Sequence, residues 1–422
     1  MEKVPNHSFI EMRLVKFTAT GVGKNETLTM KNVGNGYFSV TTGRTGVRVG
    51  RNKAVTKYLP IGEWDSFFEQ KLQFGYQVTK TEEMEKKELR KEGEYKAITD
   101  EDVRDIVNIL LNAANQVMEE EYSVSMDDIS DDMLILGQQI LIELSEKGTN
   151  ISVAEFNNKL LKLWTAIPRP AKKLSQMKVS SKEEYKDKLV KEQELLDFLL
   201  SALRGKGTLK NTDGTILEAN GLLWEKVTAE EENMLRDKMG SERARYIRAW
   251  KVTNKETEKK FEGYIKSHES CQKEDGISHL FHGSGTENFW SIITNGLYLN
   301  PQGVVISGKA FGHGLYFAPR AKKSIGYTSS YSAYWKTGNS DKAYLAVFKV
   351  ATGNIFDIYA AGGRGYGDCP DNYDDLQKYQ KDADCLWAVN RNKNSNSPLV
   401  NDEVIVYREE QATIEYLIEF AS

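Results

Sequence analysis

Leu280-Phe-His-Gly-Ser284 stands at the centre of the last third of the chain, and related short segments follow it through Gly326-Tyr327. Ser278-His-Leu-Phe-His282 alternates polar and apolar side chains before a glycine. This pattern predicts a strand that ends with a small polar cluster at its tip, where a ligand could approach the backbone.

A glycine-rich turn, Gly312-His-Gly-Leu-Tyr-Phe-Ala318, lies downstream of that strand. Glycine lets the backbone adopt unusual angles or come close to a flat ligand. Two tyrosines, Tyr316 and Tyr327, lie eleven residues apart in the same region. Together these features favour an aromatic heterocycle as the ligand.

A carboxylate opens a distant apolar run, Asp402-Glu-Val-Ile-Val-Tyr407, which predicts a buried strand. Burying a charged group is unfavourable unless the group is paired. Glu403 is therefore a candidate functional residue.

Four short motifs occur in the order and approximate spacing of the poly(ADP-ribose) polymerase catalytic domain: His282-Gly283, Gly314-Leu-Tyr316-Phe-Ala, Lys323-Ser324-x-x-Tyr327 and Glu403-x-Ile-Val-Tyr407. Each motif alone is weak, but together they extend over about 125 residues and resemble that family. His282, Tyr316 and Glu403 match its triad. The resemblance implies an NAD-dependent ADP-ribosyltransferase, of the glycosyltransferase class, with NAD as co-substrate and no permanently bound cofactor or metal.

The resemblance also implies a role for each matched residue. On the nicotinamide half of NAD, the implied contacts are His282 with a ribose hydroxyl, Gly283 and Ser324 with the carboxamide, Tyr327 and Tyr316 on the two sides of the ring, and Glu403 with the ribose 2′-hydroxyl. Ser284 and Asn288 match positions that contact the adenosine half. Glu403 would also polarise the acceptor hydroxyl during chain growth. Asn401-Asp402 replace the Tyr-Asn of the best-known members, a departure that concerns the acceptor side.

Each of these residues also has an ordinary structural interpretation. A histidine at a strand end is usually a satisfied structural residue, and a tyrosine at strand or helix spacing usually belongs to a core. The order of the motifs favours the functional interpretation. A metal site at His279-x-x-His282 is excluded on a strand, because alternation sends the two side chains to opposite faces.

The composition indicates a soluble globular protein of two to four domains, with 422 residues, 40% apolar and 28% charged. No run approaches the eighteen or so apolar residues of a membrane span, and the N-terminus lacks an apolar signal core, so neither a membrane partner nor secretion is expected. Three cysteines, Cys271, Cys369 and Cys385, form no Cys-x-x-Cys pair, which disfavours a disulfide scaffold and a zinc finger. Rossmann and P-loop fingerprints are also missing from the sequence.

Residues 1–78 predict a small β module, with strands at Glu11–Phe17, Thr27–Met30 and Tyr37–Thr41 and a helix around Trp64–Leu72. Gly43-Arg44-Thr-Gly46 resembles the signature of the Trp-Gly-Arg (WGR) domain of DNA-dependent members of the family, although Thr42 stands where the tryptophan would. Residues 1–60 hold ten Lys/Arg against three Asp/Glu, a net of +7. The candidates for phosphate contacts are Arg44, Arg48, Arg51 and Lys53. The alternative is a module that only packs on the rest of the chain.

Residues 79–99 are dense in charge and predict a linker, and residues 100–210 predict a helical bundle. Its helices are expected after an N-cap at Thr99, over Met133–Leu144 and Val153–Trp164, and from the capping box Ser181-x-x-Glu184 to near Gly205. The bundle resembles the regulatory domain of the DNA-dependent branch. Residues 100–168 hold fourteen Asp/Glu against four Lys/Arg, so we do not expect the bundle to bind DNA.

The expected architecture is multidomain α+β: a β module, a helical bundle and a catalytic domain over residues 211–422. Residues 353–400, rich in Gly, Asp, Asn and Lys, predict a long mobile loop. The first functional hypothesis is a poly(ADP-ribose) polymerase that modifies proteins, itself included, and responds to DNA ends or nicks. A mono-transferase and a non-enzymatic DNA-damage or NAD-sensing scaffold are the alternatives. The family implies a nuclear location in a eukaryote and a cytoplasmic one otherwise.

Overall fold

The protein is described here by a computed structural model, which divides into two compact units, Met1–Gly93 with Gln116–Leu199 and Glu94–Asn115 with Leu200–Ser422. The described residues are 9–18, 21–44, 55–81, 95–124, 126, 129–170, 177–204, 214–299, 311–328, 341–358, 369–395, 397 and 399–422. Among them, no helix combines the length and the apolar character that crossing a bilayer requires.

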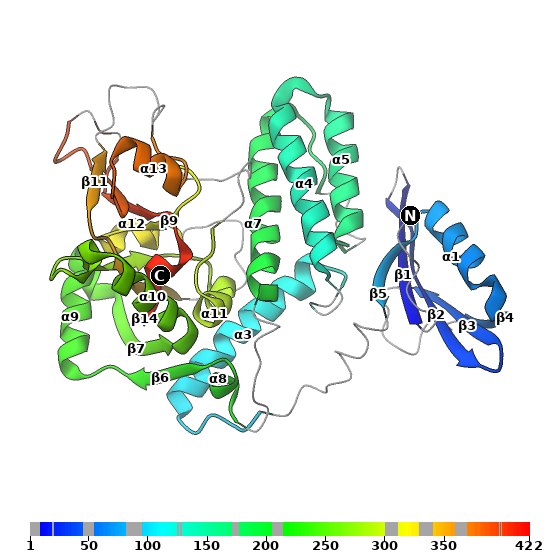
Figure 1. Ribbon diagram of the computed structural model, residues 1–422, viewed down its shortest axis with the longest axis horizontal. Helices are drawn as coiled ribbons and strands as arrows, with labels where there is room; N and C mark the ends of the chain where they lie inside the picture. The colour runs from blue at the N-terminus through cyan, green and yellow to red at the C-terminus, as the bar shows by residue number, and fades with distance from the viewer. Residues whose placement is uncertain are drawn as a thin grey trace. The chain divides into compact units, whose positions relative to one another are not determined.

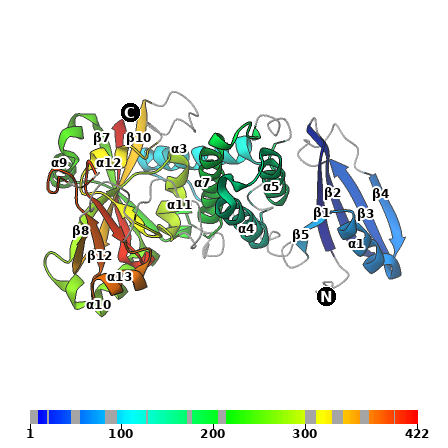
Figure 2. The same ribbon diagram turned by 90° about the horizontal axis from the view of Figure 1, so that it is seen from above.

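The N-terminal module is a five-stranded antiparallel sheet in the order β4-β3-β2-β1-β5, with helix α1 on one face (Figure 2). Its elements are β1 (Phe9–Thr18), β2 (Gly21–Gly34), β3 (Tyr37–Arg44), β4 (Val55–Pro60), α1 (Trp64–Gln73) and β5 (Gln77–Thr81). Trp64 and Phe68 of α1 pack against alternate strand residues such as Met12 and Phe38, because alternation brings every second side chain to the helix face. The predicted strands and helix are confirmed.

The basic residues proposed for phosphate contact fall outside this description. Arg48, Arg51 and Lys53 lie outside the described residues, and of Arg44 only the backbone, at the end of β3, is described. Their role stays a prediction.

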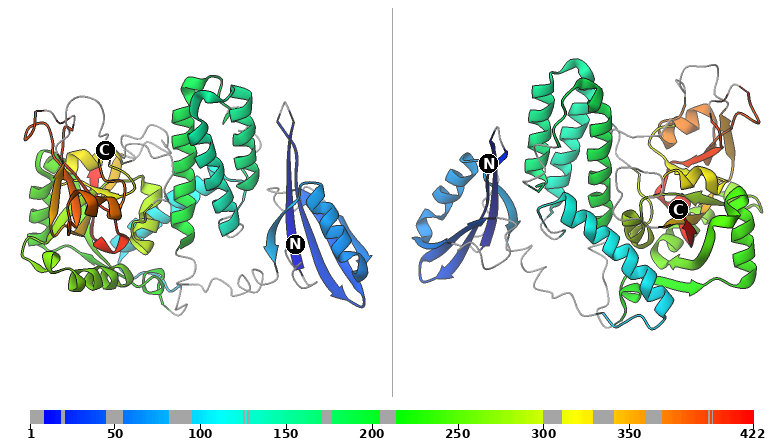
Figure 3. Two further views of the ribbon diagram at one scale, coloured as in Figure 1. Left: turned by 45° about the horizontal axis from the view of Figure 1, so that its top comes forward. Right: turned by 180° about the vertical axis from the view of Figure 1, so that it is seen from behind.

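The predicted helices of the next segment are confirmed as α3 (Glu101–Glu121), α4 (Asp131–Lys147), α5 (Val153–Ala166) and α7 (Tyr185–Arg204), and α4, α5 and α7 lie side by side (Figures 1 and 3). Two predicted caps are wrong. Asp100, not Thr99, caps α3, because its Oδ1 accepts from the N–H groups of Asp102 and Val103 at 3.0 and 3.3 Å. Ser181 makes no side-chain cap bond, and a 3-10 turn precedes α7 instead.

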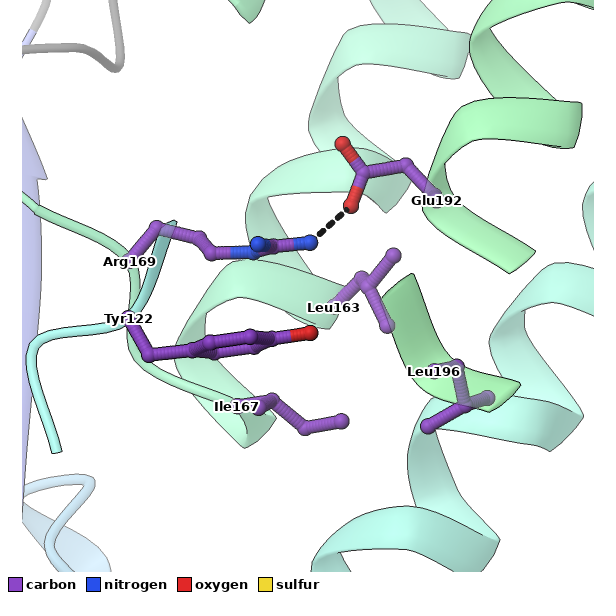
Figure 4. A pocket seen from close by; sticks show the side chains of 6 residues that line it. All are labelled: Tyr122, Leu163, Ile167, Arg169, Glu192 and Leu196. Atoms are coloured by element: carbon purple, nitrogen blue, oxygen red, sulfur yellow. Dashed lines mark hydrogen bonds and ion pairs between the residues drawn. The ribbon is translucent and has the colours of Figure 1, made fainter. Parts of the chain in front are cut away.

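A charged cluster lies in the core of these helices (Figure 4). The Arg169 guanidinium lies over the Tyr122 ring, 4.4 Å from its centroid, and donates to Glu192 at 2.7 Å. Lys188 Nζ lies 2.8 Å from the other oxygen of Glu192. Burial opposes the charge of Glu192, but the two cations outweigh it and lower its pKa to about 2.

The second unit contains a five-stranded antiparallel sheet in the order β6-β7-β14-β10-β8. The strands are β6 (Leu222–Lys226), β7 (Tyr246–Asn254), β8 (Ile277–His282), β10 (Lys342–Ala351) and β14 (Ala412–Ala421). Both faces of the sheet are covered, so the interior strand β10 is apolar almost throughout. Tyr344, Ala346, Phe348 and Val350 face one core, and Ala343, Leu345 and Val347 face the other. Helices α9 (Ala229–Met239) and α12 (Ala321–Ile325) cover the second face.

A smaller sheet, in the order β11-β12-β13-β9, contributes side chains to the same core as Phe348 of β10. Its strands are β9 (Leu315–Phe317), β11 (Ile355–Ile358), β12 (Cys385–Ala388) and β13 (Glu403–Val406). Helix α11 (Thr286–Asn295) and the first half of α3 complete that core. Helices α8 (Ile216–Ala219), α10 (Lys255–Ser267) and α13 (Tyr373–Tyr379) belong to the same unit. The strands predicted at 278–282 and 402–407 are thus confirmed as β8 and β13.

The prediction of a long loop over residues 353–400 is wrong for the described part of that segment. It contains β11, α13 and β12, and Ala383, Cys385 and Leu386 are fully buried. Asp384 fixes the segment, since its carboxylate accepts from the Asn354 N–H at 2.8 Å and the Ser270 hydroxyl at 2.5 Å. Residues 359–368 lie outside the described part.

Candidate active site

The site forms where the two sheets of the second unit meet, at the end of β8. Phe281 and Ala318 exchange backbone hydrogen bonds of 2.8 and 2.9 Å, which tie β8 to the residue after β9. The His282 ring, between Phe317 and Phe348, lies with Nδ1 3.0 Å from the Tyr316 carbonyl oxygen. A carbonyl only accepts, so Nδ1 carries a proton and donates to it.

The residue directly after β8 is Gly283, because a side chain at this position would have no room. A Cβ at this position would lie 1.9 Å from the Ser324 carbonyl oxygen, which makes the backbone of α12 the direct neighbour of the strand end. The Ser324 side chain is buried and donates to the Phe281 carbonyl at 3.1 Å. The end of β8 and Ser324 are thus in contact at two residues, Gly283 and Phe281.

Glu403 is the first residue of β13 and is only 5% exposed. Lys323 Nζ, on α12, lies 2.5 Å from its Oε1. Burial disfavours the charge of Lys323, but the hydrogen bond and the negative charge of Glu403 outweigh it and raise the pKa of the lysine. The buried carboxylate is therefore paired with a cation, as the energetics of burial require.

Two tyrosines border this pair. Tyr316 lies opposite Ile405 in the β9–β13 ladder, and its hydroxyl accepts from the Phe311 N–H at 2.8 Å and donates to the Gly312 carbonyl at 2.9 Å. Burial raises its pKa. Tyr327 is 47% exposed, with Lys323 Nζ 5.4 Å from its ring centroid. One ring is thus fixed by the turn before β9, and the other is open to a ligand.

Ser284 and Asn288 lie at the start of α11. The Asn288 amide donates to the Ser284 hydroxyl at 3.0 Å, so the two predicted residues are in contact. Burial raises the pKa of Glu287 on the same turn. His279 points elsewhere, with Nε2 2.9 Å from Glu415, and the described residues contain no metal-binding group of three or more His, Cys, Asp or Glu.

The structure brings together His282, Gly283, Ser324, Lys323, Glu403, Tyr316 and Tyr327 through the contacts above. No role was assigned to Lys323 from the sequence, although this lysine belongs to the motif Lys323-Ser324-x-x-Tyr327. Its position directly before Ser324 was the signal that could have identified it. Asp402 was likewise left without a structural role. Asp402 is buried beside Glu403 and accepts from Lys393 at 2.7 Å.

Comparison with known proteins gives a match for the part of the chain that carries this site. Residues 225–422 match the family described as the poly(ADP-ribose) polymerase catalytic domain. The putative poly [ADP-ribose] polymerase-like protein 100L of Invertebrate iridescent virus 6 is 30% identical over 162 residues, 38% of this chain and 78% of the viral protein. This chain belongs to the poly(ADP-ribose) polymerase family. It is an NAD⁺ ADP-ribosyltransferase, and NAD is its co-substrate.

Two further relatives extend this comparison. Protein 101L of the same virus, named only as uncharacterized, is 25% identical over 196 residues, 46% of this chain and 80% of its own length. Poly [ADP-ribose] polymerase 1 of Xenopus laevis is 30% identical over 151 residues, which is 33% of this chain but 14% of that protein. The match to the large vertebrate enzyme therefore concerns a small part of it.

Proposed function

We propose that this protein transfers ADP-ribose from NAD to protein acceptors and extends the product into a polymer. His282 holds a ribose hydroxyl, Gly283 and Ser324 hold the nicotinamide carboxamide, and Tyr327 stacks on the ring with Tyr316 on its other side. Ser284 and Asn288 contact the adenosine half. Glu403 binds the ribose 2′-hydroxyl and polarises the acceptor. The observation that carries the proposal is the buried Glu403, held by Lys323 within the same contact network as His282 and Tyr316.

This arrangement suits a reaction that needs little covalent assistance. The bond between nicotinamide and ribose breaks with oxocarbenium-like charge, and the acceptor attacks the anomeric carbon. Positioning and electrostatic stabilisation therefore supply most of the rate. Glu403, whose Oε1 is held by Lys323, supplies the negative charge and accepts from the ribose. Tyr327, as an exposed ring, adds about 1 kcal/mol through offset stacking.

We further propose that DNA ends or nicks regulate the enzyme through residues 1–78 and the helical segment 100–210. The net charge of +7 over residues 1–60 supports a nucleic-acid contact in the first module. The acidic helical segment would restrain catalysis until DNA is bound, a coupling that typically amounts to about 1–3 kcal/mol. A nuclear location follows from this role if the source is a eukaryote.

One incubation tests the proposed function. The protein is mixed with labelled NAD, with and without nicked DNA, and the products are separated on a gel. A ladder of high-mass products that grows with DNA is expected. A single-unit product would favour the mono-transferase, for which the Asn401-Asp402 departure is the specific observation. An unlabelled protein would favour the non-enzymatic scaffold.

A further inference from the structure

The residue before Glu403 is the centre of a hydrogen-bond cluster. Asp402 is 8% exposed, and both of its carboxylate oxygens accept two contacts each. Oδ1 accepts from the backbone N–H of Asn390 at 2.8 Å and from its side-chain amide at 2.5 Å. Oδ2 accepts from the Trp387 indole at 3.1 Å and from Lys393 Nζ at 2.7 Å. All four partners are donors.

Such a set of partners requires a carboxylate. An ionised carboxylate only accepts, with two oxygens and about four lone-pair sites. An asparagine at this position would turn an NH₂ group toward one pair of donors. In the amide, either the Asn390 pair or the pair of Trp387 and Lys393 would therefore lose its acceptor, whereas the aspartate of this chain accepts from both pairs.

The residues that donate to Asp402 lie on both sides of Ala388, the residue opposite Glu403 in the sheet. Ala388 of β12 lies opposite Glu403 in the antiparallel ladder between β12 and β13. Trp387 precedes Ala388 and Asn390 follows it by two residues, so Asp402 fastens the start of β13 to both sides of that pair. A shift of one residue in a strand would turn Glu403 to the other face of the sheet.

We propose that Asp402 is a positioning residue, which together with Lys393 fixes the register and direction of Glu403 toward Lys323. The proposal rests on the proposed function in one respect, namely that Glu403 is the catalytic carboxylate. Asp402 touches neither NAD nor acceptor in this scheme and acts through its neighbour.

The charges around the cluster are consistent with a fixed ion pair. Burial opposes the charge of Asp402, but the hydrogen bonds from Lys393 and Trp387 outweigh it and lower its pKa. Asp357 on β11 lies opposite Trp387 in the ladder between β11 and β12. Its pKa is raised, because burial and the charge of Asp402 outweigh the opposite effect of Lys393. Lys393 thus compensates the charge of two carboxylates, Asp402 and Asp357, and its removal should weaken the contacts that hold Asp402.

The first test compares Asp402→Asn with the full-length wild-type protein under steady-state conditions. A displacement of Glu403 by about 1 Å should lower kcat by up to about 100-fold. KM for NAD should change less, because the other groups assigned to NAD binding, such as Gly283 and Ser324, are untouched. Lys393→Met, at a side chain that is 60% exposed, should fold normally and lower kcat by a smaller factor. Asp375→Asn and Lys378→Met remove another Asp–Lys pair of this unit, at 2.8 Å, and should leave kcat unchanged.

The second test asks whether Asp402 acts through Glu403. In a Glu403→Gln background, Asp402→Asn should cause no further loss of the residual NAD hydrolysis, because the group that it positions is already absent. Equal additional losses in both backgrounds would show a general structural role and overturn the proposal. Unchanged kcat in both Asp402→Asn and Lys393→Met, with an active wild type, would also overturn it. An inactive wild type would instead contradict the proposed function. If Asp402→Asn fails to fold, Lys393→Met alone decides.

Discussion

At the scale of single residues, the pair Glu403–Lys323 determines what the site can do. The carboxylate is almost fully buried, and Lys323 Nζ lies 2.5 Å away on a short helix. A buried charge is kept only where partners compensate its desolvation, and Lys323 is such a partner for Glu403. Lys323 thus pairs with Glu403, the carboxylate that the sequence pattern indicated as a candidate functional residue.

Replacement of Glu403 by glutamine keeps the shape of the side chain and removes its charge. We expect polymer elongation to fall by about 100- to 1,000-fold, because an electrostatic contact with the reacting groups is lost, while NAD affinity changes little. Elongation is measured on gels with labelled NAD, and affinity by titration calorimetry. Glu410→Gln, on the turn after β13, is the control and should behave like the wild type. Long polymer from Glu403→Gln would show that another residue polarises the acceptor.

Gly283 gives a prediction that follows from distance alone. In Gly283→Ala the new Cβ would lie 1.9 Å from the Ser324 carbonyl oxygen, so α12 must move away from β8. We expect a loss of about 1–3 kcal/mol in the free energy of unfolding of the catalytic unit, with weaker binding of nicotinamide analogues. Urea unfolding and calorimetry measure the two effects. In the control Gly263→Ala, in α10, the added Cβ has no atom within 4 Å, and stability should rise slightly. Equal stability of the two variants would contradict the close approach.

At the scale of elements, the sequence predicted those strands whose pattern is local. Ser278–His282 alternates and Val404–Val406 is continuously apolar, and both lie in strands. The segment 353–400 was mispredicted because its order comes from distant partners. β12 has four residues, pairs in parallel with β11, and is fixed through Asp384 by Ser270, which no local pattern reveals. Likewise, the pairing of Lys323 with Glu403 joins positions eighty residues apart, and only the fold brings them together.

The cluster of Arg169 and Glu192 predicts how the helical segment responds to acid. The folded-state pKa of Glu192 is about 2 and its ordinary value is 4.5, so its stabilisation is complete above about pH 4.5 and is lost as the pH falls toward 2. A shift of this size corresponds to about 3 kcal/mol. Urea unfolding of the helices, followed by circular dichroism between pH 6 and pH 2, should show this loss.

The variant Glu192→Gln provides the comparison. It should be less stable than the wild type at pH 7, since Arg169 then loses the nearer of its two buried carboxylates and keeps Glu121 at 3.6 Å, but it should lose less stability on acidification. Parallel curves for the two proteins would mean that other carboxylates cause the acid response.

At the scale of the whole molecule, the helical segment does not coincide with one unit. Glu94–Asn115 belongs to the second unit, and Val103, Ile106, Val107 and Leu110 of α3 are buried in its main core. Asp102, at the start of α3, contacts Arg248 and accepts from the Trp250 indole at 3.2 Å. The first half of α3 is therefore part of the catalytic unit, although it stands more than a hundred residues before β8.

This division determines which deletion can test regulation. Removal of residues 100–205 would also remove four buried apolar side chains, a loss of about 6–12 kcal/mol. That loss is comparable with the whole stability of a typical domain, about 5–15 kcal/mol. We expect this variant to be unfolded or inactive for a reason unrelated to regulation. Replacement of residues 116–199 alone by a short Gly-Ser linker keeps the core of the second unit complete.

The variant without residues 116–199 should unfold cooperatively on heating and should show higher basal activity than the full chain, without a response to nicked DNA. Since phosphate contacts dominate such binding, activation of the full chain should fall steeply with salt, whereas the activity of the deletion should not. Thermal unfolding and labelled-NAD assays, with and without DNA at two salt concentrations, measure these effects. A folded but inactive deletion would make the helices a structural support for catalysis. A full chain that is fully active without DNA would show that they do not restrain it.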